Sequence, residues 1–236
     1  MDSRPIPPLR SLPRAFVTAW PAEMPELFEL PAEEVRKFRN VLRLGTGDQV
    51  VVLPGDGRLI RCELRGHSVA PLETFEPQTE SPRHVTLALG MPRQEKLEES
   101  VRMGSEMGVA EFIVFPAERS VVRWDASKLE AKMKRLDSIA REACEVSFRT
   151  RLPRIRYVAS FAKLLEEIPA AIVLSEVEGV SPTLTPQAKM TLVIGPEGGW
   201  APREVALIGD RAATLGPRVL RVDTAAAAAC ALALLA

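Results

Sequence analysis

Two glycine-rich loops near the carboxyl terminus hold the residues best suited to chemistry. Residues 195–199 read Gly-Pro-Glu-Gly-Gly and follow an apolar run at 192–194, while residues 215–221 carry Arg218 and Arg221 after a Gly-Pro turn. A short β-branched run that ends in glycine is typical of a buried strand opening into a loop at its carboxyl end. Ligands of open α/β sheets bind outside those ends, so we expect the two loops to build one pocket, largely from backbone groups.

The side chains on these loops indicate what the pocket could do. Glycine permits close approach of the backbone to a ligand, and Glu197 is a carboxylate on a loop that Pro196 stiffens, so it can accept hydrogen bonds. Arg218 and Arg221 are candidate clamps for a substrate. The loops have neither the lysine of a phosphate-binding P-loop nor the spacing of a dinucleotide fingerprint.

Structural interpretations of the same residues stay open at this point. The first loop can be a tight connection to a helix that starts near Pro202, with Glu204 at its positive end. Val219 and Leu220 can pack in the core while the neighbouring arginines are solvated. The Asp-Thr pair at 223–224 is expected to cap the last helix.

The remaining sequence argues against several other kinds of function. His67 and His84 stand alone, without metal-ligand spacing, and no G-x-S-x-G turn is present, so we expect neither a metal site nor covalent serine catalysis. Cys62, Cys144 and Cys230 are far apart and form no Cys-x-x-Cys pair. A cytoplasmic protein is therefore expected. We also expect neither a signal peptide nor a membrane-spanning segment.

Local charge favours a polyanionic partner although the formal net charge is zero. Residues 118–156 hold eleven lysines and arginines against six acidic residues. Pairing at i, i+4 along a helix explains part of this excess. It does not explain the arginines that have no acid among them, which are Arg149, Arg151, Arg154 and Arg156. A cluster of this kind is what RNA phosphates require.

The first 75 residues are predicted to form a small β-rich unit. A helix over residues 31–44 would place Arg36, Arg39 and Arg43 on one face, either as a solvated face or as a surface for phosphates. The strands are expected at 50–53, 58–64 and 67–75. The polar, proline-bearing residues 76–83 are typical of a linker.

Residues 84–236 change to an alternation of strands and helices. Strands are predicted at 85–89, 111–115, 170–174, 191–194 and 213–215. Helices are predicted at 94–108, 126–148, 202–210 and 224–236. This alternation indicates an α/β domain with a mostly parallel sheet.

The combined motifs resemble the RsmE family, which comprises SPOUT-class methyltransferases that modify uridine N3 in 16S ribosomal RNA. The resemblance is carried by residues 192–199, 215–221 and 223–225, and it extends to 40–48, 105–109, 116–120 and 142–145. Val146 and Phe148 interrupt a block that usually ends in Gln-Ser-x-Arg, and Asp223 stands where glutamate is common.

The resemblance implies a fold and partners for the chain. Residues 1–75 would form a PUA-like β-barrel that binds RNA, residues 76–83 a linker, and residues 84–236 a SPOUT domain with a deep trefoil knot. A homodimer would be built on the knot. The cofactor would be S-adenosylmethionine, and the substrate 16S rRNA of the small ribosomal subunit.

The resemblance also assigns the cofactor to three loops, with adenine among the backbone groups of residues 215–220. The implied cofactor-binding residues are Leu174, Ser175, Glu176, Ile194, Gly195, Pro196, Gly199, Leu215, Gly216, Pro217, Val219 and Leu220. For catalysis, uridine N3 must lose its proton. We expect Arg218 or Arg221 to stabilise the resulting anion. Glu197 is a candidate base or a structural residue, and Asp223 is a weaker candidate for either catalytic role.

Other functions remain as alternatives. The chain could be another SPOUT enzyme that acts on tRNA or on a ribose hydroxyl. It could also be a noncatalytic RNA-binding assembly factor or an α/β nucleotide binder of a different kind. The intact loops at 195–199 and 215–220 favour a cofactor-binding enzyme over the assembly factor.

Overall fold

The computed structural model describes residues 8–175 and 183–235, which divide into two compact units. Described residues up to Glu80, together with Phe148–Arg151, form the first unit. The second unit consists of Ser81–Ser147 and the described residues from Leu152 onward. The inclusion of Phe148–Arg151 in the first unit was not predicted from the sequence.

The first unit is built on a five-stranded sheet with strand order β1-β3-β4-β5-β2. The strands are β1 (Arg14–Phe16), β2 (Phe28–Glu29), β3 (Gln49–Leu53), β4 (Leu59–Arg65) and β5 (Ser68–Phe75). β1 pairs with β3 in parallel, and the other pairs are antiparallel. The three predicted strands are confirmed. β1 and β2 were missed because runs of three and two residues carry almost no periodicity.

The predicted helix over residues 31–44 is wrong in its second half. A short 3-10 turn, η1 (Leu9–Ser11), comes earlier in this unit, and α1 (Ala32–Arg36) continues as a π-helix, η2 (Lys37–Val41). Arg43 then takes a left-handed backbone conformation with φ 58°. Residues at i, i+3 and i+7 share a face only in a regular α-helix, so the predicted arginine stripe is interrupted.

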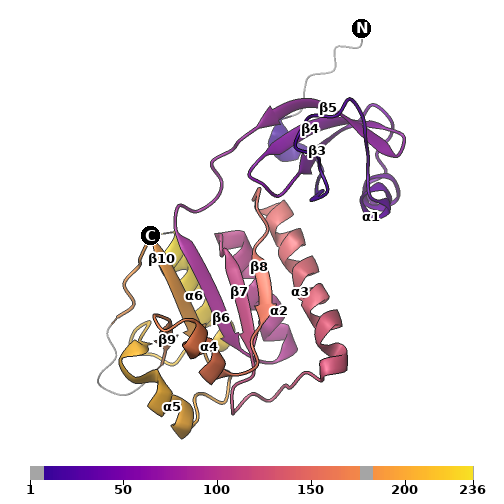
Figure 1. The fold of residues 1–236 in the computed structure, drawn as a ribbon. Helices are drawn as coiled ribbons and strands as arrows, with labels where there is room; N and C mark the ends of the chain where they lie inside the picture. Colours follow the sequence, from indigo (N-terminus) through magenta and orange to yellow (C-terminus); the bar gives the residue numbers. More distant parts are fainter. Residues whose placement is uncertain (1–7, 176–182, 236) are drawn as a thin grey trace. The chain divides into compact units, whose positions relative to one another are not determined.

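The second unit is built on a six-stranded sheet with strand order β11-β9-β10-β6-β7-β8 (Figure 1). Its strands are β6 (His84–Gly90), β7 (Glu111–Phe115), β8 (Arg154–Tyr157), β9 (Ile172–Leu174), β10 (Lys189–Ile194) and β11 (Ala212–Ala213). All of the paired strands run parallel. The predicted parallel α/β sheet is confirmed, while β8 was missed.

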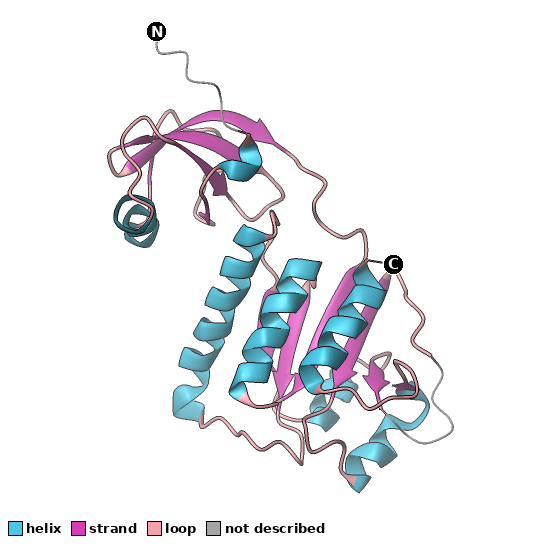
Figure 2. Cartoon of the chain, turned by 180° about the vertical axis from the view of Figure 1, so that it is seen from behind, coloured by secondary structure: helices cyan, strands magenta, loops and turns pink. Residues whose placement is uncertain are grey.

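Helices cover both faces of this parallel sheet. The helices are α2 (Gln94–Met107), α3 (Ala126–Val146), α4 (Phe161–Glu167), α5 (Pro202–Ile208) and α6 (Val222–Leu234), with a 3-10 turn, η3 (Gly209–Arg211), after α5. Figure 2 shows α2, α3 and α6 side by side on one face. The short α4, with seven residues, was not predicted.

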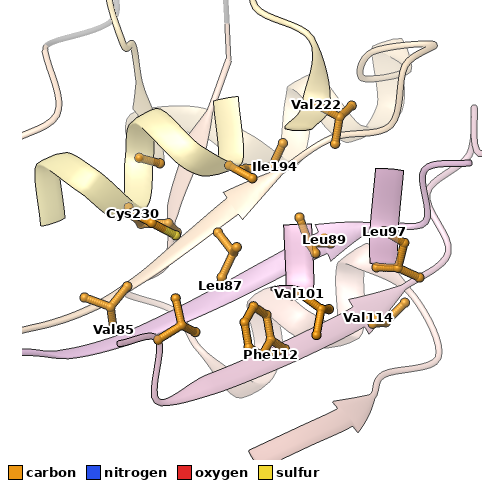
Figure 3. Close-up of a cluster of buried hydrophobic side chains, with 14 of the residues drawn as sticks. Val85, Leu87, Leu89, Leu97, Val101, Phe112, Val114, Ile194, Val222 and Cys230 are labelled. Atoms are coloured by element: carbon orange, nitrogen blue, oxygen red, sulfur yellow. The ribbon is translucent and has the colours of Figure 1, made fainter. Parts of the chain in front are cut away.

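Alternate residues of the central strands feed two separate cores. Val85, Leu87 and Leu89 of β6 pack with apolar residues of α2, α3 and α6, as the close-up in Figure 3 shows for part of this cluster. Ala88 points to the opposite core, which Phe161 of α4 and other residues complete. This two-sided burial explains why consecutive residues 87–89 of the strand are all apolar.

Two properties of the described residues bear on the environment of the chain. No described helix is long and apolar enough to cross a membrane. Cys62, Cys144 and Cys230 are free thiols in buried positions. Burial raises the pKa of the thiols of Cys62 and Cys230 to about 12.

We expect none of the three cysteines to react rapidly with a thiol reagent at neutral pH, because burial blocks access to all three and keeps the thiols of Cys62 and Cys230 protonated. Titration with an aromatic disulfide reagent should give a slow absorbance change in the native protein. All three thiols should react quickly in guanidinium chloride. Immediate release of the reagent's aromatic thiolate by the native chain would contradict this expectation.

Candidate active site

A cavity of about 780 Å³ opens in the second unit at the carboxyl ends of β6, β9, β10 and β11. Its volume lies in the range of small-molecule sites. The residues that line it are Arg93, Lys96, Leu174, Ser175, Ile194, Gly195, Pro196, Glu197, Gly199, Trp200, Val205, Ala213, Thr214, Leu215, Arg218, Val219, Leu220, Arg221, Val222, Asp223 and Ala225.

Most residues proposed from the sequence lie together in this cavity wall. They come from the ends of three strands: Leu174, Ser175, Ile194, Gly195, Pro196, Gly199, Leu215, Val219 and Leu220. Glu197, Arg218 and Arg221 line the same cavity. Gly216 and Pro217 are absent from its described wall, and Glu176 lies outside the described residues.

Trp200 connects the end of β9 to the loop that follows β10. Its indole Nε1 donates a hydrogen bond to the carbonyl oxygen of Leu174 at 3.1 Å, and its ring stacks on Phe161 with centroids 4.6 Å apart. A Cβ atom on Gly195 would lie 2.9 Å from the indole Cε2. Glycine is therefore required at this position because the indole occupies the space of a side chain.

The loop at 195–199 is also tied to its neighbours by carboxylates. Oε1 of Glu197 accepts a hydrogen bond from the backbone N–H of Arg93 at 3.1 Å, although the Glu197 side chain is exposed. The buried carboxylate of Glu204 accepts from the backbone N–H groups of Ala201 and Glu118, at 3.0 and 2.9 Å. The predicted placement of Glu204 in the first turn of a helix is confirmed.

The loop at 215–221 turns sharply at Gly216, whose φ is 124°. The hydroxyl of Thr214 accepts from the Gly216 N–H at 3.1 Å and donates to the Gly216 carbonyl at 2.8 Å. Val219 is 84% exposed, so the alternative that buried it in the core is wrong. Arg218 and Arg221 are exposed at the cavity.

The predicted cap of the last helix by residues 223–224 is wrong. α6 already begins at Val222, and its N-cap residue Arg221 makes no capping hydrogen bond through its side chain. Asp223 instead lies in the first turn, where Oδ2 accepts from Nζ of Lys96 at 2.5 Å. This hydrogen bond from Lys96 lowers the pKa of the Asp223 carboxyl.

The residues of the β6–α2 connection were missed as part of the site. Arg93 and Lys96 line the cavity directly after β6. The signal was present in the sequence, because the predicted strand at 85–89 ends beside them. The same rule of ligand binding at carboxyl strand ends applies to it.

Acidic residues from distant segments pair with several arginines of the 149–156 cluster. Arg149 is buried, and its Nε and Nη2 atoms both donate to Glu80, at 3.0 and 2.9 Å. The prediction that Arg149 binds phosphate is therefore corrected: its guanidinium is consumed by an internal ion pair. Arg156 similarly bonds Glu111 at 2.9 Å.

The other arginines predicted to bind RNA differ in exposure and in their contacts with the rest of the chain. Arg151, Arg36 and Arg43 are exposed, and Arg39 donates to the carbonyl of Leu44 at 3.1 Å. Arg154 is exposed and lies 3.9 Å from Glu111, a distance at which attraction through water is weak.

No group of three or more His, Cys, Asp or Glu side chains is placed to hold a metal ion within residues 8–175 and 183–235.

Comparison with known proteins decides the family. Residues 79–234 match the model of an RNA methyltransferase domain. The chain is 34% identical over 219 residues to the ribosomal RNA small subunit methyltransferase E of Bacillus subtilis, which covers 84% of this chain and 86% of that protein. The chain belongs to the ribosomal RNA small subunit methyltransferase E (RsmE) family.

A further relative and a solved structure are also similar to the chain. The protein of the same name from Mycobacterium bovis is 33% identical over 209 residues, covering 80% of this chain and 79% of that one. A Legionella pneumophila protein described as a methyltransferase, solved with bound SAM, is 28% identical, with a TM-score of 0.83 over 94% of this chain and 96% of that one.

We expect Gly195→Ala to destabilise the chain by about 1–3 kcal/mol, because the added methyl group would force the Trp200 indole from its place. Denaturant unfolding measures the change. Gly45→Ala is the matched control, since its Cβ would lie 3.6 Å from the nearest atom, and it should stay within about 0.5 kcal/mol of the parent. Equal stabilities for the two variants would contradict the proposed packing.

Proposed function

We propose that this chain methylates N3 of a uridine in 16S ribosomal RNA, with S-adenosylmethionine as the cofactor. The observation that carries the proposal is the cavity formed by the glycine-rich loops after β9, β10 and β11, with arginines at its wall. Membership of the RsmE family supports rRNA methylation. The bound SAM of the Legionella relative supports the cofactor.

The residues present fit such a cofactor. The cavity of about 780 Å³ is large enough for a nucleoside with an amino-acid chain. Residues 215–220 offer backbone groups for adenine, and the tight turn at Gly216 keeps them together. When bound, S-adenosylmethionine supplies an electrophilic methyl group on sulfonium.

The chain's own residues then act on the acceptor base. Neutral uridine carries a proton on N3, and loss of this proton spreads negative charge over O2 and O4. Arg218 or Arg221 stabilises that charge through guanidinium N–H donors. Glu197 is the candidate base because, among the described residues, its Oε1 alone is engaged, by the Arg93 backbone, which leaves Oε2 to accept a proton.

We also propose the domain roles that the family resemblance implies. Residues 1–75 form a PUA-like RNA-binding barrel, 76–83 a linker and 84–236 a SPOUT domain. Arg36, Arg39, Arg43, Arg151 and Arg154 hold RNA phosphates, and Arg149 is left out because it is paired with Glu80. The protein works in the cytoplasm.

A trefoil knot and a homodimer complete the proposal. The order of elements supports threading: β11 lies at the sheet edge beside β9, whereas α6, which follows it, packs on β6 and β10. The apolar side chains of Leu232 and Leu235 on or just after α6 are exposed and are available to a second copy. Light scattering after gel filtration should give twice the mass of one chain.

We expect Arg218→Ala to keep its affinity for S-adenosylhomocysteine in calorimetry but to lose methyl transfer by at least about 100-fold, because its guanidinium acts on the charged acceptor. Arg102→Ala is the control, since Arg102 is exposed on α2, pairs with Glu99 and lies outside the described cavity wall. Unchanged turnover of Arg218→Ala would remove this arginine from the mechanism.

The reaction itself is tested with unmodified small ribosomal subunits and cofactor carrying a labelled methyl group. The label should appear as N3-methyluridine in 16S rRNA when the nucleosides are separated by chromatography and identified by mass spectrometry. Ribose-methylated nucleosides, or label in tRNA only, would contradict the proposed acceptor. Absence of cofactor binding would favour a noncatalytic assembly factor.

A further inference from the structure

An ion pair inside the cavity is not used by the reaction as described so far. Lys96, in the first turn of α2, and Asp223, in the first turn of α6, meet at 2.5 Å between Nζ and Oδ2. Both residues line the cavity, with side-chain exposures of 32% and 21%. Leu97, which follows Lys96 on α2, and Val222, which precedes Asp223 on α6, belong to the same buried cluster (Figure 3). The pair is therefore anchored on two packed helices.

The ammonium group of Lys96 has donors to spare. It carries three N–H groups, and Asp223 is the sole partner that the described part of the chain provides for Nζ. Two N–H groups thus remain on a half-buried side chain whose position is fixed by a carboxylate. A fixed, partly desolvated ammonium binds an anionic oxygen more strongly than a freely rotating one.

Asp223 holds this arrangement at a cost. Its Oδ1 atom is buried and has no hydrogen-bond partner among the described residues. A buried carboxylate oxygen without a hydrogen-bond partner destabilises the fold. Because Oδ1 is closed to solvent, a ligand does not reach it. The contact of its Oδ2 with Nζ of Lys96 therefore fits a positioning role for Asp223.

The surrounding charges favour an anionic ligand group. The described cavity wall contains four cationic side chains, Arg93, Lys96, Arg218 and Arg221, against two acidic ones, Glu197 and Asp223. The first turns of α2 and α6 add the positive ends of two helix dipoles. An oxygen that carries part of a negative charge is the best partner for the remaining N–H groups of Lys96.

We propose that Lys96, positioned by Asp223, donates hydrogen bonds to a delocalised anionic oxygen of the bound ligand. The inference rests on the proposed function. Two ligand groups share this chemistry: the carboxylate at the methionyl end of the cofactor, and the O2/O4 system of a uracil that has lost its N3 proton. Lys96, held by Asp223, offers the same remaining N–H donors to either group.

Calorimetry on the full chain tests whether Lys96 binds the carboxylate of the cofactor. Lys96→Met keeps the stem of the side chain and removes the charge, and Arg102→Met is the matched control on the same helix. Probes are S-adenosylhomocysteine and 5′-methylthioadenosine, which lacks the carboxylate. If Lys96 binds the carboxylate, Lys96→Met should lose at least about tenfold in affinity for the first probe and nothing for the second.

Kinetic measurements test whether Lys96 binds the uracil oxygens. If Lys96 binds the uracil oxygens, both affinities stay at the parental value and kcat falls by at least about tenfold at neutral pH. Loss of a cation that stabilises the anion raises the apparent pKa of the acid limb of the pH–rate profile, so the deficit should shrink as pH rises. Lys96→Arg should recover part of the lost activity or affinity.

Asp223→Asn tests the positioning role and stands in if Lys96→Met fails to fold. It should reproduce the effect of Lys96→Met in the same probe or the same pH profile, a result that general destabilisation does not give. The inference is overturned if Lys96→Met or, in its place, Asp223→Asn matches Arg102→Met in every measurement while the parent chain binds and methylates. If the parent chain itself neither binds S-adenosylhomocysteine nor methylates, the proposed function fails, and the inference falls with it.

Discussion

The parallel register of the second sheet is the constraint on which the site depends. One row of cross-strand partners runs through all six strands: Ala213, Leu174, Ile194, Leu89, Val114 and Tyr157. Since parallel strands in register end at the same level, the loops that follow four neighbouring strands meet at one edge. Segments more than 120 residues apart in sequence, such as Arg93 and Asp223, become walls of one cavity.

Specific ties then hold these loops in place. The Trp200 indole joins the end of β9 to the loop after β10, the Glu197 carboxylate joins that loop to the start of α2, and Lys96 joins α2 to α6. Each tie connects two different strand ends, so the loops do not depend on their own short-range structure. A site built in this way is organised before a ligand arrives, which lowers the entropic cost of binding.

Much of the fold and part of the site could be predicted from local patterns. The strand at 111–115 was found because residues 112–115 form a continuous apolar run, and the helix starting at Gln94 because its apolar residues follow helical spacing. The two loops were found because glycine marks strand ends. Local patterns could not show that Glu80 pairs with Arg149, nor that Lys96 pairs with Asp223, since these partners lie 69 and 127 residues apart. The predicted cap at 223–224 failed because α6 begins earlier, at Val222, which places Asp223 inside the first turn, where it meets Lys96.

The position of Trp200 gives the chain an intrinsic optical signal. The sequence contains three tryptophans, of which Trp20 is buried in the first unit and Trp124 packs against a core of the second. Trp200 alone among them lines the cavity, with one edge hydrogen-bonded to Leu174 and one face on Phe161. A molecule that enters the cavity changes the polarity around a single indole, so the emission of the unlabelled protein reports occupancy directly.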